Sequence, residues 1–231
     1  MGERTALGLS AVAAVAMLAI ATLMAVTAAP CNPLPMSTLT AFELVRSVSD
    51  LQRIFGLPGE ACRVALVSQL DHANLVDSFG YIPAYTAFYG LAVYALGRRD
   101  RTIGWIAVAI ALGCAIVDGF ENFSMFQLSA APDTQSPWIM ALVVSTNAKW
   151  VGLAGVTTLA GVMLARRGGF GWIALIACAA PLVTSLWAVV APDAAGQYLI
   201  PGMTISSVML LAVAVVEVFR RQSGKPTVET T

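Results

Sequence analysis

The sequence predicts an all-α polytopic membrane bundle of six transmembrane helices with an external amphipathic helix. Hydrophobic residues make up 58% of the 231 residues and charged residues only 11%, whereas a soluble domain is about 25% charged. Apolar segments long enough to cross the roughly 30 Å of hydrocarbon as helices recur along the chain. Clusters of arginine between them give one consistent orientation. We therefore expect one transmembrane domain over residues 1–221.

The first apolar run covers residues 6–29, after Arg4. It is longer than the roughly 7 to 15 apolar residues of a signal-peptide core, so a retained spanning helix is favoured. Its end, Thr27-Ala28-Ala29, still resembles a small-residue cleavage site. Cleavage, which would leave five spans, stays open.

Residues 30–75 are expected to form an external loop. Three prolines after residue 29 break the first helix. Ser37 can then cap an amphipathic helix that runs to about Phe55 and places Glu43 and Arg46 on its polar face. A helix of this kind lies on the membrane surface or on top of the bundle.

Two of the four cysteines, Cys31 and Cys62, fall in this loop. An external loop meets the oxidising environment that permits a disulfide bond between them. Their separation in the sequence does not fix the geometry that a bond requires, so the pairing stays open.

The second span is expected over residues 76–96. Asp77, Tyr81 and Tyr85 follow one another at i, i+4 and i+8, so they line one stripe of this helix. Pro83 is expected to kink it. Tyr85 lies too deep for an interfacial aromatic belt, so we expect its side chain to face protein.

The remaining spans are predicted over residues 102–128, 138–165, 170–190 and 198–219, followed by a disordered cytoplasmic tail over 222–231. Basic residues before span one and after spans two, four and six fall on one side of this arrangement: Arg4, Arg98, Arg99, Arg101, Arg166, Arg167, Arg220 and Arg221. The positive-inside rule then places both termini in the cytoplasm. An arginine-rich, alanine-rich composition suggests a bacterial protein, so the expected location is the bacterial inner (plasma) membrane.

The third span carries three polar side chains near its end. Asp118, Glu121 and Asn122 stand at i, i+3 and i+4 and share one helix face. A charge at this depth costs about 2.5 to 3.5 kcal/mol on insertion scales. The fourth span supplies a partner in Lys149, which is the lone charge between residues 139 and 165. We predict a buried polar cluster of these residues with Asp77, Tyr81 and Tyr85.

Counting helical rise supports one polar layer. At 1.5 Å per residue, Asp118, Lys149 and Tyr81 all lie about 22 to 24 Å from the cytoplasmic end of their spans. Ser185 and Thr204 come out at about 22 Å by the same count. Five spans thus place a polar group in the outer third of the bilayer.

Three functions fit this cluster. One is a binding or transport site for a small molecule or lipid. The small size of the chain and its lack of an internal repeat argue against a complete transporter, unless the chain forms a homo-oligomer. Another is a membrane-embedded enzyme acting on a lipid or lipid-linked substrate, with Asp118 or Glu121 as general acid/base. The third is a structural or accessory subunit in which polar contacts hold helices together. No catalytic residue is assigned, and Ser185 or Ser206 with Lys149 is only a weak candidate pair.

Composition narrows the partners. The 13 basic and 13 acidic residues cancel, so there is no electrostatic reason to expect nucleic acid. One histidine, His72, does not suffice for a zinc site of the usual kind, and Lys149 would repel Mg²⁺ or Ca²⁺ at the carboxylates. The expected partners are the lipid bilayer and a small-molecule or lipid ligand, with no metal and no cofactor.

Several landmarks occur together between residues 39 and 149. They are Phe42-Glu43-Leu44 in the external helix, Asp77 opening the next span, Asp118-x-x-Glu121-Asn122, and the lone Lys149. In this order they resemble an uncharacterised group of small bacterial polytopic membrane proteins. No activity is established for that group, so the resemblance implies a fold and no reaction.

Overall fold

The structure, a computed structural model, describes residues 1–223. Its elements in chain order are α1 (Glu3–Leu23), α2 (Thr38–Glu43), α3 (Val48–Phe55), α4 (Ala61–Val76), the π-helical turn η1 (Asp77–Tyr81), α5 (Ile82–Leu96), α6 (Arg101–Ala130), α7 (Pro137–Ala165), α8 (Gly171–Val190) and α9 (Pro192–Ser223). The described part of the chain is helical without strands. Apart from its first two residues, the predicted tail over 222–231 lies outside the described residues.

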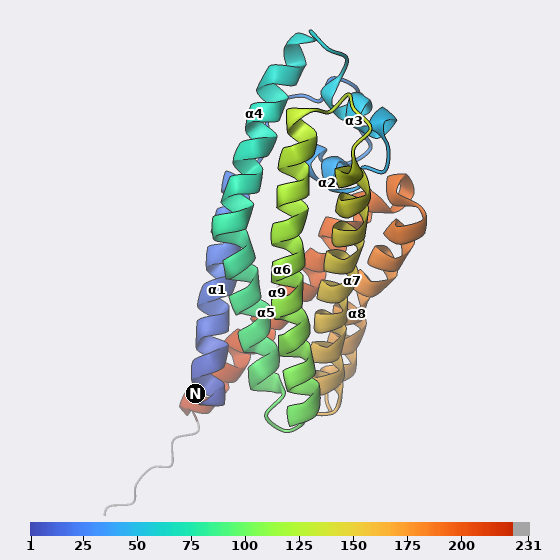
Figure 1. Cartoon of the computed structure of the whole chain (residues 1–231). Helices are drawn as coiled ribbons and strands as arrows, with labels where there is room; N and C mark the ends of the chain where they lie inside the picture. Colours follow the sequence, from blue (N-terminus) through green and yellow to red (C-terminus); the bar gives the residue numbers. More distant parts are fainter. Residues whose placement is uncertain (224–231) are drawn as a thin grey trace, which may run out of the picture.

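Five helices are long and apolar enough to cross a membrane: α1, α6, α7, α8 and α9. The chain is therefore a membrane-embedded helical protein. The predicted second span, 76–96, is built differently, because η1 interrupts it and α5 alone has 15 residues. In Figure 1, α4, η1 and α5 continue one another as a single column along the bundle.

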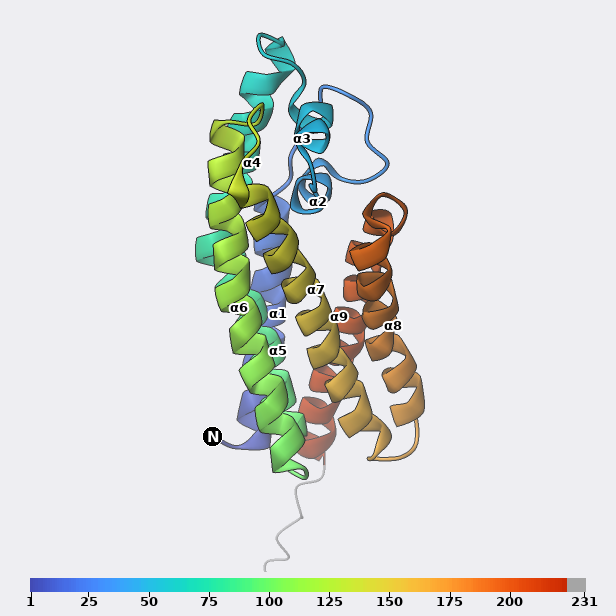
Figure 2. The ribbon, with the colours of Figure 1, turned by 45° about the vertical axis from the view of Figure 1, so that its right-hand side comes forward.

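The long helices form a closed ring in chain order. Each of α5, α6, α7, α8 and α9 packs against the helix before it in the ring, and α1 packs against both α5 and α9 (Figures 1 and 2). A ring of this kind buries polar side chains that would otherwise meet lipid. It leaves room for an internal cavity between α1, α5, α7 and α9.

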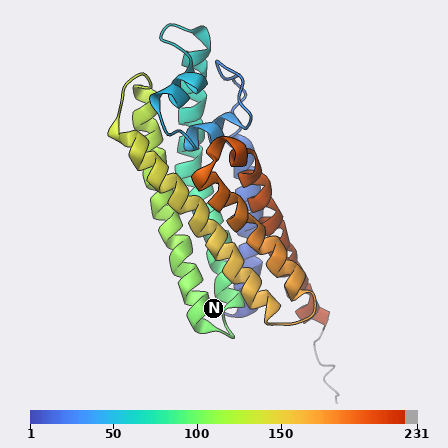
Figure 3. The same cartoon turned by 90° about the vertical axis from the view of Figure 1, so that its right-hand side faces the viewer.

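One end of the ring gathers the N-terminus and the short α5–α6 and α7–α8 turns (Figure 3). Arg98 donates a hydrogen bond of 2.9 Å to the Met1 carbonyl oxygen, and Arg167 lies 3.4 Å from the Glu3 carboxylate. Arg166 pairs with Asp100 at the same end. The arginines near the N-terminus, in the α5–α6 turn and in the α7–α8 turn, on which the predicted membrane orientation depends, thus lie at the same end.

The opposite end is covered by the segment between α1 and α4 (Figure 2). The prediction of a single helix from Ser37 to Phe55 is wrong: the chain forms α2 and α3 with a break at residues 44–47. The break arises because Ser47 caps a new helix by accepting from the Asp50 amide. Buried side chains of α2, of the break and of α3 then pack against α4, α6 and α7: Phe42, Val45, Leu51, Ile54 and Phe55.

Candidate functional site

Lys149 of α7 lies at the centre of a group of carboxylates inside the ring. Its Nζ atom is 2.9 Å from Glu121 Oε1, 3.2 Å from Asp118 Oδ1 and 3.3 Å from Glu43 Oε1. Lys149 is only 6% exposed, and Asp118 and Glu121 still less. An ammonium group has three N–H donors, so the three carboxylates match its donor capacity.

Glu43 is the residue that sequence reasoning missed. The break after α2 turns its side chain inward, away from the polar helix face predicted for it. Glu43 Oε2 accepts a hydrogen bond of 3.1 Å from the indole of Trp150, and its backbone oxygen accepts from Thr146. Burial raises the pKa of the Glu43 carboxyl above its ordinary value, and Lys149 opposes this rise. The position of Glu43 between the apolar residues Phe42 and Leu44 was the sequence signal that could have indicated its burial.

Asp77 and Asn122 meet at the side of the same group. Asn122 donates hydrogen bonds of 2.6 Å to Asp77 Oδ2 and 3.0 Å to the Ser78 hydroxyl. Asp77 opens the π turn, whose wider loop is closed by a bond from the Ile82 amide to the Asp77 carbonyl oxygen. Pro83 follows at the start of α5, where its missing N–H is tolerated. Single π turns of this kind occur frequently at functional sites.

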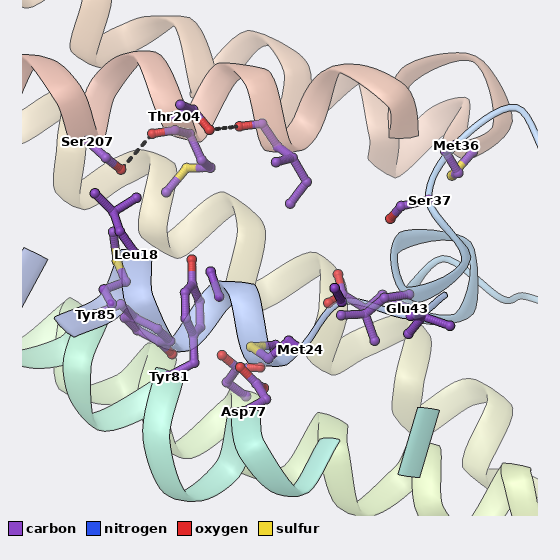
Figure 4. Close-up of a pocket in the computed structure, with 18 of the residues that line it drawn as sticks. Leu18, Met24, Met36, Ser37, Glu43, Asp77, Tyr81, Tyr85, Thr204 and Ser207 are labelled. Atoms are coloured by element: carbon purple, nitrogen blue, oxygen red, sulfur yellow. Dashed lines mark hydrogen bonds between the residues drawn. The ribbon is translucent and has the colours of Figure 1, made fainter. Parts of the chain in front are cut away.

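A cavity of about 700 Å³ opens beside these charges. Figure 4 shows Glu43, Asp77, Tyr81 and Tyr85 on one side of it and Thr204 on α9 across from them. Asp118 and Lys149 also line it. The rest of the wall is largely apolar and comes from α1, the segment after it, and α9: Ala14, Met17, Leu18, Ala21, Met24, Leu34, Met36, Ile200, Met203, Val208 and Leu211.

Aromatic rings form the wall next to the carboxylates. Tyr81, Tyr85 and Tyr89 follow one another with ring centroids 5.7 and 6.3 Å apart. Tyr85 is 2% exposed, and its hydroxyl has no hydrogen-bond partner among the described residues.

The structure brings all seven predicted site residues together. Glu121 contacts Lys149 and Asn122 contacts Asp77, and the other five line the cavity: Asp77, Tyr81, Tyr85, Asp118 and Lys149. Thr204 lines the cavity but donates to the Ile200 carbonyl on its own helix. Ser185 and Ser206 each donate to a backbone carbonyl oxygen. Since Lys149 is directed at carboxylates, the geometry does not assemble a serine–lysine pair.

Cys31 and Cys62 are joined in a disulfide bond that ties the segment before α2 to the start of α4. Glu60 lies close to both sulfur atoms, and these three residues are the one group of neighbouring potential metal ligands within residues 1–223. The sulfur atoms are held in the disulfide, so they are not thiolate ligands. The arrangement favours a structural tie.

Comparison with known proteins gives no match to a family model, a curated protein or a solved structure. The resemblance to small bacterial polytopic proteins therefore stays a prediction.

Proposed function

We propose that the chain is a six-span protein of the bacterial inner membrane with both termini in the cytoplasm. The second of these spans is the column formed by η1 and α5 together with the end of α4, which packs between α1 and α6. The positive-inside rule supports the orientation, because the arginine-rich turns lie at the end of the bundle that holds the N-terminus. The cap of α2 and α3 is then external.

The function that the site supports best is binding, or passage, of a small ligand or lipid with an apolar body and a polar head. A single observation carries this proposal: one cavity of about 700 Å³ joins a group of charged side chains to an apolar wall. Ligand pockets usually have about 300 to 1,000 Å³ and place a few polar groups in a mostly apolar lining. A purely structural cluster needs no cavity beside it.

The test is to fill the cavity and to measure what the protein retains. Ala21 of α1 lines the cavity, so Ala21→Phe should displace a bound amphiphile. Ala19 lies on the same helix with an exposed side chain that does not line the cavity, so Ala19→Phe is a matched control.

Native mass spectrometry of both variants and the wild type in the same detergent gives the readout. We expect amphiphile adducts on the wild type and on Ala19→Phe, and at least tenfold fewer on Ala21→Phe. Equal numbers of adducts on all three proteins would contradict the proposal that the cavity binds the amphiphile. Conversion of a bound molecule during incubation would instead favour the enzyme hypothesis.

A further inference from the structure

The charges around the cavity are strongly unequal. The cluster holds four carboxyl groups and one ammonium group. Glu43, Asp118 and Glu121 lie within 3.3 Å of Lys149 Nζ, and Asp77 beside them accepts a hydrogen bond from Asn122. Glu43, Asp77 and Asp118 line the cavity together with Lys149. Glu121 contacts Lys149 and has no exposed surface. Burial of unpaired charge is costly, so the cluster favours a second positive charge over a negative one.

Lys149 is not available to bind an anion. Its Nζ atom donates to Glu121 Oε1, and carboxylate oxygens of Asp118 and Glu43 lie within 3.3 Å of the same atom. An anionic head group would have to displace one of these oxygens and would then face the remaining carboxylates. Acceptors, in contrast, are in surplus: Glu121 Oε2 has no hydrogen-bond partner among the described residues, and the carboxylates of Asp77 and Asp118 line the cavity.

The aromatic wall is an independent observation that points the same way. Tyr81, Tyr85, Phe88, Tyr89 and Trp150 line the cavity beside the acidic groups. Ring faces attract ammonium groups through their quadrupole, by about 0.5 to 2 kcal/mol. The site already holds one such contact, because Lys149 Nζ lies 5.2 Å from the centre of the Trp150 ring.

We propose that the ligand is a cationic amphiphile, with an ammonium head bound between Asp77, Asp118, Glu43 and the tyrosine rings, and an alkyl chain lying along α1 and α9. This inference rests on the proposed binding function and names the class of its ligand. Tyr85 lines the same space, so its ring adds to the aromatic surroundings of the head group. Apolar side chains such as Leu18, Met203 and Leu211 accommodate the chain.

The experiment is a competition between three probes of equal chain length: dodecylammonium, dodecanol and dodecanoate. The purified full chain is offered equal amounts of each, and native mass spectrometry counts the adducts. We expect at least a tenfold preference for dodecylammonium in the wild type. Asp118→Asn should reduce that preference by a similar factor, and comparison of the two proteins cancels the partitioning of each probe into detergent.

The outcomes distinguish a failure of the cationic head group from a failure of the proposed binding function. Equal binding of all three probes, or preference for dodecanoate, overturns the cationic head while leaving the cavity function in place. Absence of every adduct, with no difference between wild type and Ala21→Phe, overturns both. Butylammonium binding as tightly as dodecylammonium overturns the amphiphile and assigns the site to a water-soluble amine.

If Asp118→Asn does not fold, the competition on the wild type decides the head group alone. Asp77→Asn then supplies the second variant, because Asp77 lines the cavity outside the contacts of Lys149. The expected result is again a loss of preference for dodecylammonium. A preference unchanged in a folded variant places the head group elsewhere and contradicts the proposal.

Discussion

Lys149→Met tests whether one lysine holds the carboxylates of the cluster. The substitution keeps a chain of similar length and removes the positive charge that lies 2.9 to 3.3 Å from three carboxylate oxygens. Two of those carboxylates, Asp118 and Glu121, are almost completely buried. Breaking a buried ion pair by removing one partner typically costs about 3 to 5 kcal/mol, because the other charge is left without compensation. We expect a loss of unfolding free energy in that range.

The assay is reversible unfolding in mixed detergent micelles with increasing SDS, followed by the helical circular dichroism signal. Arg99→Met is the control, because Arg99 is exposed in the turn after α5 and its loss should change stability by no more than about 0.5 kcal/mol. The double variant Lys149→Met with Glu121→Gln should be more stable than Lys149→Met alone. Glu121→Gln removes the most buried of the carboxylates that Lys149→Met leaves unpaired, so part of the lost stability returns. Mutations at contacting residues typically deviate from additivity by about 0.5 to 3 kcal/mol.

A different outcome would refute the reasoning. If Lys149→Met loses less than about 1 kcal/mol, the pairs behave like solvated surface pairs, and the cluster is not a desolvated ion-paired group. Strict additivity in the double variant would lead to the same conclusion. Normal folding together with normal ligand binding in Lys149→Met with Asp118→Asn would leave the cluster no role in the site.

Three further results are expected. Cys62→Ser opens a loop of 31 residues closed by the bond to Cys31, which by the chain-entropy relation costs about 3 to 4 kcal/mol and should speed proteolysis before α4. The native pKa of Glu43 lies above its ordinary value of 4.5, so the native state holds its proton more tightly and stability falls as pH rises above 4.5; Glu43→Gln should flatten that decline. Gly97→Ala should cost about 1 to 3 kcal/mol through overpacking, because its Cβ would clash with the backbone of Gly104.

Each of these has its own contrary result. Equal proteolysis of oxidised wild type and Cys62→Ser would show that the disulfide does not restrain the segment. A pH profile that Glu43→Gln leaves unchanged would mean that other groups cause it. Gly113→Ala is the matched control for Gly97→Ala, since an added Cβ there meets nothing within 4 Å; equal losses in both variants would contradict the close contact of α5 with α6.

The sequence alone was sufficient for the class of protein and for most of the cluster. Length and apolarity predicted the five long helices with ends within a few residues of those observed, except at the first and last spans. Helical spacing placed Asp118 and Glu121 on one face, and the cost of burying Lys149 required a carboxylate partner. These features could be predicted because helix periodicity depends on residues close together in the chain. The need for a charged partner follows from the large free-energy cost of burying an unpaired charge.

Only the tertiary structure decided how Glu43 and the second span contribute. Glu43 fits the polar face of an amphipathic helix by pattern, yet the chain breaks after it and the packing of Phe42 and Val45 turns it toward Lys149. The π turn at Asp77 likewise leaves no mark in the hydrophobic pattern. Which lone polar residues share a cavity depends on how six helices close into a ring. That closure is set by packing between residues far apart in the chain, which periodicity and composition do not encode.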